Sequence, residues 1–112
     1  HYRQAAGTGK KKTSALLMAT TLSSELLEKY FSLTKAALEK AQQAFHAEKR
    51  TDAAMVFDMA SRYYADARYF VTQDDPIRAF AALNYAHGWL DAGARLGLFQ
   101  VHDSNLFAVD SE

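Results

Sequence analysis

The sequence predicts an all-α protein, specifically an up-and-down three-helix bundle with a short C-terminal tail packed on it. Three observations favour this fold. Apolar residues recur at helical spacing in three long segments, residues that cap helices precede each segment, and the 112 residues include one proline and five glycines. A chain of this length has room for one hydrophobic core. We therefore expect residues 22–112 to form a single helical domain.

Residues 1–21 differ in composition from the rest of the chain. They contain Arg3, Lys10, Lys11 and Lys12 and no acidic residue, whereas residues 22–112 carry nine basic against 13 acidic residues. Gly, Ser and Thr are frequent in this segment, and helical periodicity is absent from most of it. We expect residues 1–21 to be a flexible basic leader, either native or added during cloning.

The first helix is predicted over about residues 23–49. Ser23 or Ser24 can cap its N-terminus, and Glu25 and Glu28 suit the positive end of a helix dipole. Its apolar stripe comprises Leu27, Phe31, Thr34, Leu38, Ala41 and Phe45.

The second and third helices are predicted over about residues 52–73 and 76–96. Thr51 or Asp52 can cap the second helix. Asp75 can cap the third, and Pro76 suits a first helical position, where the missing N–H costs nothing. Gly97 stands where a helix-terminating glycine is expected. The apolar stripe of the second helix comprises Val56, Met59, Ala60, Tyr63, Ala67, Phe70 and Val71.

The third helix has more apolar surface than two neighbouring helices can cover. Apolar and small residues occupy roughly two-thirds of its circumference at 100° per residue. This excess predicts self-association, with a dimer favoured, or binding of a helical protein partner. Packing of the tail through Phe99, Leu106 and Phe107 is the alternative. The expected association surface consists of Tyr85, Ala86, Trp89, Leu90, Gly93 and Leu96.

A polar line interrupts the apolar surface of the third helix. It contains Asn84, His87, Asp91 and Arg95, in which the last three are spaced by four residues. One hypothesis is a small-ligand or RNA-processing site in which Asp91 orients His87 and Arg95 binds an anion. The alternative is a solvated stripe with two weak ion pairs. Arg95 and His102 also have the spacing found in a class of small helical ribonucleases.

Several classes of chemistry lack support in the sequence. The chain has no cysteine, which excludes disulfides and thiolate chemistry, and no two of its four histidines have i, i+4 spacing. We therefore predict no catalytic residues, no metal and no cofactor. The acidic charge of residues 22–112 argues against a nucleic-acid surface. No apolar run approaches the roughly 20 residues of a membrane-spanning helix, so we expect a cytoplasmic protein.

Two segments carry a family resemblance. Residues 30–38 and, more specifically, residues 78–97 resemble a family of short archaeal proteins known as domain of unknown function family 357, DUF357. The resemblance covers about residues 24–100. It implies a three-helix bundle in an archaeal cytoplasm, and it assigns no activity and no catalytic residue. We accordingly expect a non-enzymatic protein-interaction or self-association module.

Overall fold

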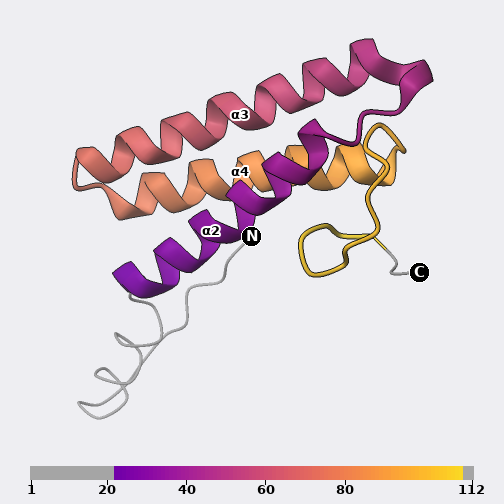
Figure 1. Ribbon diagram of the computed structural model, residues 1–112. Helices are drawn as coiled ribbons and strands as arrows, with labels where there is room; N and C mark the ends of the chain where they lie inside the picture. The colour runs from indigo at the N-terminus through magenta and orange to yellow at the C-terminus, as the bar shows by residue number, and fades with distance from the viewer. Residues whose placement is uncertain (1–21, 110–112) are drawn as a thin grey trace, which may run out of the picture.

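The computed structural model describes residues 22–109, which form three long helices and a C-terminal tail (Figure 1). The helices are α2 (Ser24–Gln42), α3 (Arg50–Thr72) and α4 (Pro76–Arg95), and a 3₁₀-helix over Ala47–Lys49 precedes α3. Helices α3 and α4 lie side by side as an antiparallel hairpin, and α2 packs across one face of it. The predicted all-α three-helix bundle is confirmed. The basic leader proposed for residues 1–21 lies outside the described residues.

The N-termini of α2 and α4 are capped as the sequence predicts. The Ser23 side chain accepts a hydrogen bond from the Leu26 N–H at 3.0 Å, and the Asp75 side chain accepts one from the Arg78 N–H at 3.1 Å. These caps satisfy backbone donors that have no partner within the helix. Pro76 occupies the first turn of α4, where its fixed φ suits the helix.

The C-terminus of α4 ends in a glycine turn, as the position of Gly97 predicts. Gly97 has a φ of +73°, in the left-handed region that a side chain rarely adopts. The Leu98 N–H donates to the Gly93 carbonyl at 2.9 Å, and the Gly97 N–H donates to the Ala94 carbonyl at 3.1 Å. This pair of bonds is the Schellman motif. It reverses the chain and directs the tail back over α4.

The first helix ends earlier than the predicted residue 49. Helix α2 stops at Gln42, and the following residues turn toward the tail. The His46 N–H donates to the Leu98 carbonyl and the Gln100 N–H to the Ala44 carbonyl, both at 2.8 Å, so that Phe45 and Phe99 form an antiparallel bridge. These backbone groups bond to the tail instead of continuing a helix.

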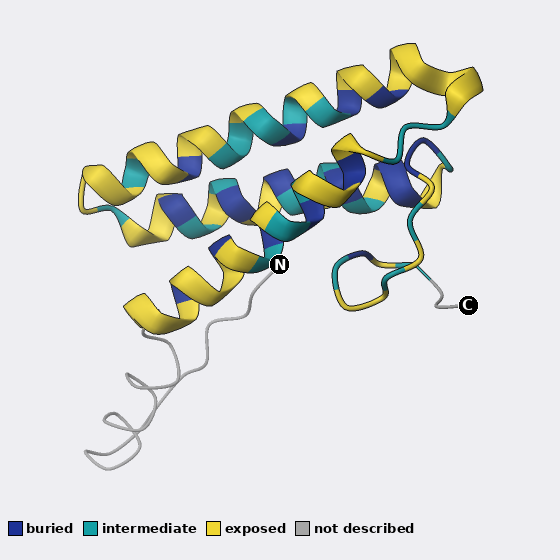
Figure 2. Ribbon diagram, in the orientation of Figure 1, coloured by how far each residue is buried: buried dark blue, intermediate teal, exposed yellow. Residues whose placement is uncertain are grey.

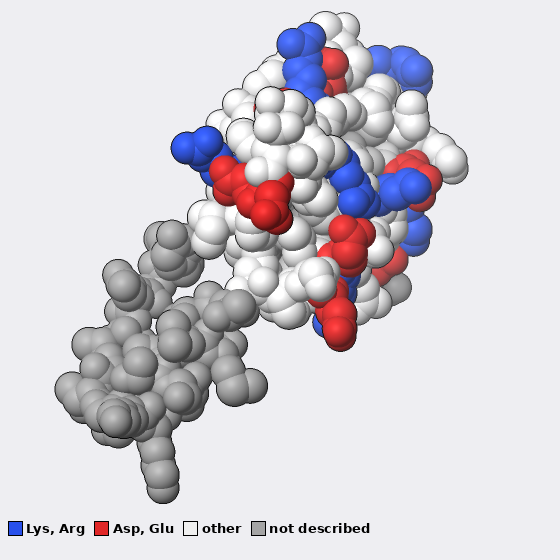
Figure 3. Space-filling model, turned by 90° about the vertical axis from the view of Figure 1, so that its left-hand side faces the viewer, with Lys and Arg blue, Asp and Glu red and all other residues white. Residues whose placement is uncertain are grey.

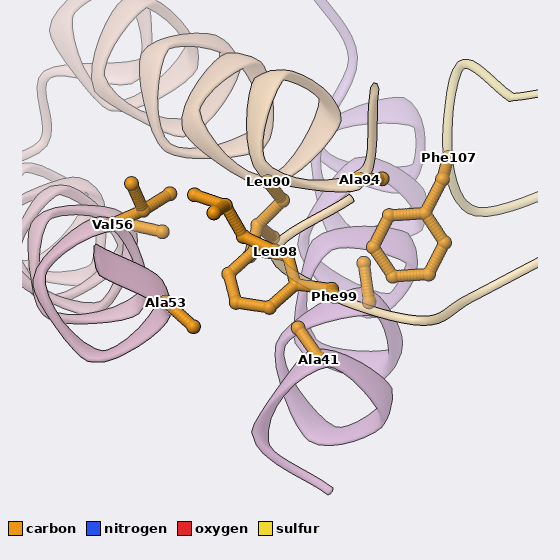
Figure 4. Close-up of a cluster of buried hydrophobic side chains, with 10 residues drawn as sticks. Ala41, Ala53, Val56, Leu90, Ala94, Leu98, Phe99 and Phe107 are labelled. Atoms are coloured by element: carbon orange, nitrogen blue, oxygen red, sulfur yellow. The ribbon is translucent and has the colours of Figure 1, made fainter. Parts of the chain in front are cut away.

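The core consists of two clusters, one toward each end of the bundle. Figure 4 shows the first, in which Phe99 of the tail lies among helices α2, α3 and α4 and Phe107 packs beside it. Both rings are almost completely buried. Phe31 of α2 and Leu83 of α4 lie in the second cluster, toward the α3–α4 turn. The outward faces of the helices remain exposed (Figure 2).

Helices α2 and α3 are also joined by Arg68. Its guanidinium lies 3.9 Å from the centre of the Phe31 ring and 3.3 Å from a Glu28 carboxylate oxygen. A guanidinium stacked on an aromatic ring is attracted by the negative face of the ring.

None of the helices between residues 22 and 109 is both long and apolar enough to cross a membrane.

Candidate functional site

His87 connects α4 to both α2 and the tail. Its Nδ1 lies 2.9 Å from the Oγ1 of Thr34 in α2, and its Nε2 lies 2.6 Å from the Leu106 carbonyl oxygen. A carbonyl can only accept, so Nε2 carries a proton and donates it to Leu106. In the neutral imidazole, Nδ1 then accepts a hydrogen bond from the Thr34 hydroxyl. Thr34 is buried, and this bond satisfies its side chain.

Asp91, one turn after His87, also holds the tail. Its Oδ1 accepts a hydrogen bond from the Ala108 N–H at 2.8 Å and lies 3.8 Å from the Nε2 of His87. The sequence-predicted pairing of His87 with Asp91 is therefore present, but it is a loose ion pair at most. The stronger contacts of both side chains are with residues 106 and 108. The geometry indicates that these two residues fix the tail.

The four residues of the polar line are not brought together in one concave site. Asn84 is exposed on the surface of α4, whereas His87 and Asp91 are partly covered by the tail. Arg95 is exposed and lies at the edge of a separate hollow at the end of the bundle. An active site built on all four side chains is therefore not assembled in this structure.

The predicted association surface is divided between the core and the exterior. Ala86 and Leu90 are completely buried, and Gly93 packs against the ring of Phe99. These three residues are occupied by contacts within the chain, and the tail covers them in part. Tyr85 and Leu96 remain exposed, and Trp89 is partly buried.

The exposed part of this surface continues onto α3. The Tyr85 ring makes edge contacts with the rings of Tyr63 in α3 and Trp89, with centroids 4.4 and 6.2 Å apart. Met55 and Met59 are each two residues from Phe57 on α3, which corresponds to nearly the opposite side of the helix. Because the Phe57 ring contacts Phe45, Met55 and Met59 point away from Phe45, in the same direction as Tyr85 and Trp89. We call this surface the aromatic face; it comprises Met55, Met59, Tyr63, Tyr85, Trp89 and Leu96.

The aromatic face lies on the side of the hairpin opposite α2. Tyr85 and Trp89 are each two residues from His87, and two residues correspond to about 200° around a helix. His87 contacts α2, so these two rings point away from it. The contribution of α3 to this face could not be predicted from the sequence, because Met59 and Tyr63 also fit the apolar stripe of α3. Only the direction from which α2 packs distinguishes the two sides.

A hollow of about 540 Å³ lies where the residues after α2 meet the residues after α4. Four residues with basic side chains line it, and we call it the end hollow; these residues are His46, Lys49, Arg95 and His102. Arg95 and His102, whose spacing is noted above, both line this cavity. His46 and Lys49 were missed, because the backbone pairing of residues 44–46 with 98–100 brings them there.

The tail is fixed electrostatically at Asp103. Lys40 of α2 donates a hydrogen bond to Asp103 at 3.1 Å, and the Asn105 N–H donates another at 3.0 Å. Both bonds favour the ionised carboxylate, and they hold the pKa of Asp103 below its usual value, Lys40 making the largest contribution. The charge of Lys40 is therefore engaged by the tail.

Metal ligands do not converge anywhere in the described part of the chain. No group of three or more His, Asp or Glu side chains within residues 22–109 is placed to hold an ion. The arrangement therefore offers hydrogen-bonding and apolar surfaces as candidates for function.

The chain was compared with known proteins. Neither a curated protein nor a solved structure gave a significant match. A family model described as "Protein of unknown function (DUF357)" matches residues 29–99, which include most of α2, all of α3 and α4, and the glycine turn. This match spans more than half of the 112 residues and includes both the buried and the exposed residues of α4. The chain therefore belongs to the DUF357 family.

Proposed function

We propose that this protein is a non-enzymatic interaction module that forms a homodimer through the aromatic face. The observation that carries the proposal is the group of large apolar side chains on the side of the hairpin opposite α2, three of which are exposed. Met55, Tyr85 and Leu96 are 53%, 52% and 66% exposed. Aromatic residues and methionine are enriched in protein interfaces and depleted on ordinary surfaces. Burying them against a second copy would remove this area from water.

The charges beside the aromatic face favour a second copy over an unrelated partner. Asp52 and Asp66 on α3 have the helical spacing of Met59, and Arg78 on α4 has that of Tyr85, each seven residues away. The α3 side of the face therefore has an acidic residue at each end, and the α4 side carries Arg78, which also pairs with Asp75 at 3.5 Å. A surface with both signs can be complementary to itself.

A two-fold axis parallel to the helices would use this complementarity. It would place α3 of each copy over α4 of the other, as a two-fold interface requires the same patch from both. Tyr63 and Tyr85 stand at the same level of the hairpin. Asp66 is three residues from Tyr63 toward the α3–α4 turn, and Arg78 is seven residues from Tyr85 in the same direction. In the dimer, Asp66 of one copy and Arg78 of the other would therefore be about one helical turn apart, within the reach of an arginine side chain.

The alternative is a small-ligand or RNA-processing activity on the polar line of α4. It receives less support from the geometry, since the side chains of His87 and Asp91 bond to Thr34 and to the tail. Asn84 and Arg95 lie apart from them on exposed surface. A site on the polar line would require these side chains to move together, whereas self-association requires no such rearrangement.

The test is the mass of the protein in solution. We expect the wild type to sediment as a dimer at micromolar concentration and Leu96→Asp and Tyr85→Asp to sediment as monomers. Either substitution would place a charge in a desolvated contact, which costs several kcal/mol. Ile77→Asp and Tyr69→Asp are matched controls, because these residues are 67% and 58% exposed and lie outside the face. Both controls should stay dimeric.

Charge reversal provides a second test of the orientation. Asp66→Arg and Arg78→Asp should each weaken the dimer, and the double variant should restore it. A monomeric wild type, or a dimer that the two face variants leave intact, would contradict the proposal. Circular dichroism of every variant establishes that the monomers are folded.

A further inference from the structure

The end hollow gathers basic groups from three separate segments. His46 and Lys49 come from the connection between α2 and α3, Arg95 from the last turn of α4, and His102 from the tail. No carboxylate lines the cavity. Within residues 22–109, the Arg95 guanidinium forms no ion pair, and the His102 ring forms no hydrogen bond. Lys49 donates to the Leu96 carbonyl at 3.4 Å, which leaves two of its three N–H groups available.

The end hollow differs from two other parts of the described structure, in which basic side chains lie beside carboxylates. Figure 3 shows the opposite end of the molecule, where Lys and Arg side chains lie next to Asp and Glu side chains. A second hollow adjoins the end hollow and shares residues 100–102 with it. Its lysine, Lys40, is already paired with Asp103 at 3.1 Å. Lys49 and Arg95, by contrast, line only the end hollow, where no carboxylate accompanies them.

We propose that the end hollow binds a small organic molecule through a phosphate group. Guanidinium and ammonium groups are the usual protein partners of phosphate oxygens, and an arginine can donate two parallel hydrogen bonds to them. Val101 and Val109 add apolar surface to the lining, which would contact the organic part of the ligand. The volume of about 540 Å³ lies in the range of small-molecule sites. The inference is independent of self-association, because no residue of the aromatic face lines the end hollow.

The experiment uses calorimetry on the full chain, with inorganic pyrophosphate and adenosine monophosphate as probes at physiological salt. We expect both to bind, and Arg95→Gln and Lys49→Gln to weaken binding by about tenfold or more each, because a hydrogen bond to a charged group contributes about 1.5–3 kcal/mol. Arg62→Gln on α3 and Lys35→Gln on α2 are the controls, since both residues are exposed and neither lines the hollow. They should change the affinity by less than about twofold.

Three outcomes would overturn the inference. The first is the absence of binding of either probe to the wild type. The second is an equal loss of affinity in all four variants, which would indicate a diffuse attraction of anions to the surface. The third is binding of the probes that Arg95→Gln and Lys49→Gln leave unchanged, which would place the ligand outside the end hollow. Thermal unfolding of Arg95→Gln and Lys49→Gln separates lost binding from lost folding.

Discussion

His87 forms hydrogen bonds with two segments that are far from it in the sequence. It bonds to Thr34 of α2 through one ring nitrogen and to the Leu106 carbonyl through the other. Asp91 lies beside it and accepts from the Ala108 N–H. Both ring nitrogens of His87 are therefore used in hydrogen bonds that connect α4 to α2 and to the tail.

The Thr34–His87 hydrogen bond gives a testable prediction. His87→Ala should lower the free energy of unfolding by about 1–3 kcal/mol, since it leaves the buried Thr34 hydroxyl and the Leu106 carbonyl without their partner. Thr34→Val removes the hydroxyl at nearly constant shape and should cost less. A double-mutant cycle measured by urea unfolding should give a clear coupling energy between the two sites. Additive effects would contradict the bond.

The sequence could predict part of this connection. The spacing of four residues correctly puts His87 and Asp91 on the same side of one helix. It carries no information about Thr34, Leu106 or Ala108, whose proximity depends on how α2 and the tail fold back. The polar line is therefore open to two interpretations from the sequence, a site or a solvated stripe, and only tertiary contacts show that two of its members hold the tail.

Among the elements, α4 contains two glycines with opposite environments. A Cβ at Gly93 would overlap with the ring of Phe99, whereas a Cβ at Gly88 would meet nothing within 4 Å. Gly93 thus permits the tail to approach the helix backbone, and its carbonyl accepts from both Leu98 and Phe99. The close approach of Phe99 therefore explains why a small residue, Gly93, stands in the apolar surface of α4.

The two glycines form a matched pair for mutation. Gly93→Ala should lower the free energy of unfolding by about 1–3 kcal/mol, because the core must shift to accommodate the methyl group. Gly88→Ala should raise it by about 0.5–1 kcal/mol through better helix propensity. Thermal unfolding monitored by circular dichroism measures both. Stabilisation by both substitutions would show that Phe99 does not pack closely on α4.

Most helix boundaries were predictable where local chemistry determines them. The start of α3 is an exception: the predicted caps Thr51 and Asp52 are wrong, because α3 begins at Arg50, after Lys49, with no side-chain cap. Ser23, Asp75 and Gly97 act at the positions that their side chains or backbone suit. The end of α2 was not predictable in this way, because Phe45 continues the apolar periodicity of the helix. Its backbone pairs instead with that of Phe99, a contact between residues far apart in the sequence.

At the scale of the whole molecule, the tail supplies part of the core that the three helices leave incomplete. Phe99 and Phe107 are almost fully buried, and both belong to segments after α4. The sequence indicated an excess of apolar surface on α4 and left two ways to cover it. The structure shows that the tail covers one side. The aromatic face, on the other side, is the surface that we propose binds a second copy.

The pairing of residues 44–46 with residues 98–100 has a consequence for the order in which the protein assembles. The hairpin of α3 and α4 is joined by a short turn, whereas this pairing closes a loop that encloses the whole hairpin. Closing long loops carries an entropic cost before contacts compensate for it. We therefore expect the hairpin to form early and the tail to dock late.

Stopped-flow kinetics would reveal this order. Ala65→Gly, at an exposed position of α3, should mainly slow folding, and Phe107→Ala should mainly speed unfolding. The reverse pattern would contradict an early hairpin. If the order holds, the last step in folding creates the end hollow, because His102 and Arg95 share it only after docking. A ligand held there would then slow the release of the tail and so lengthen the lifetime of the native state.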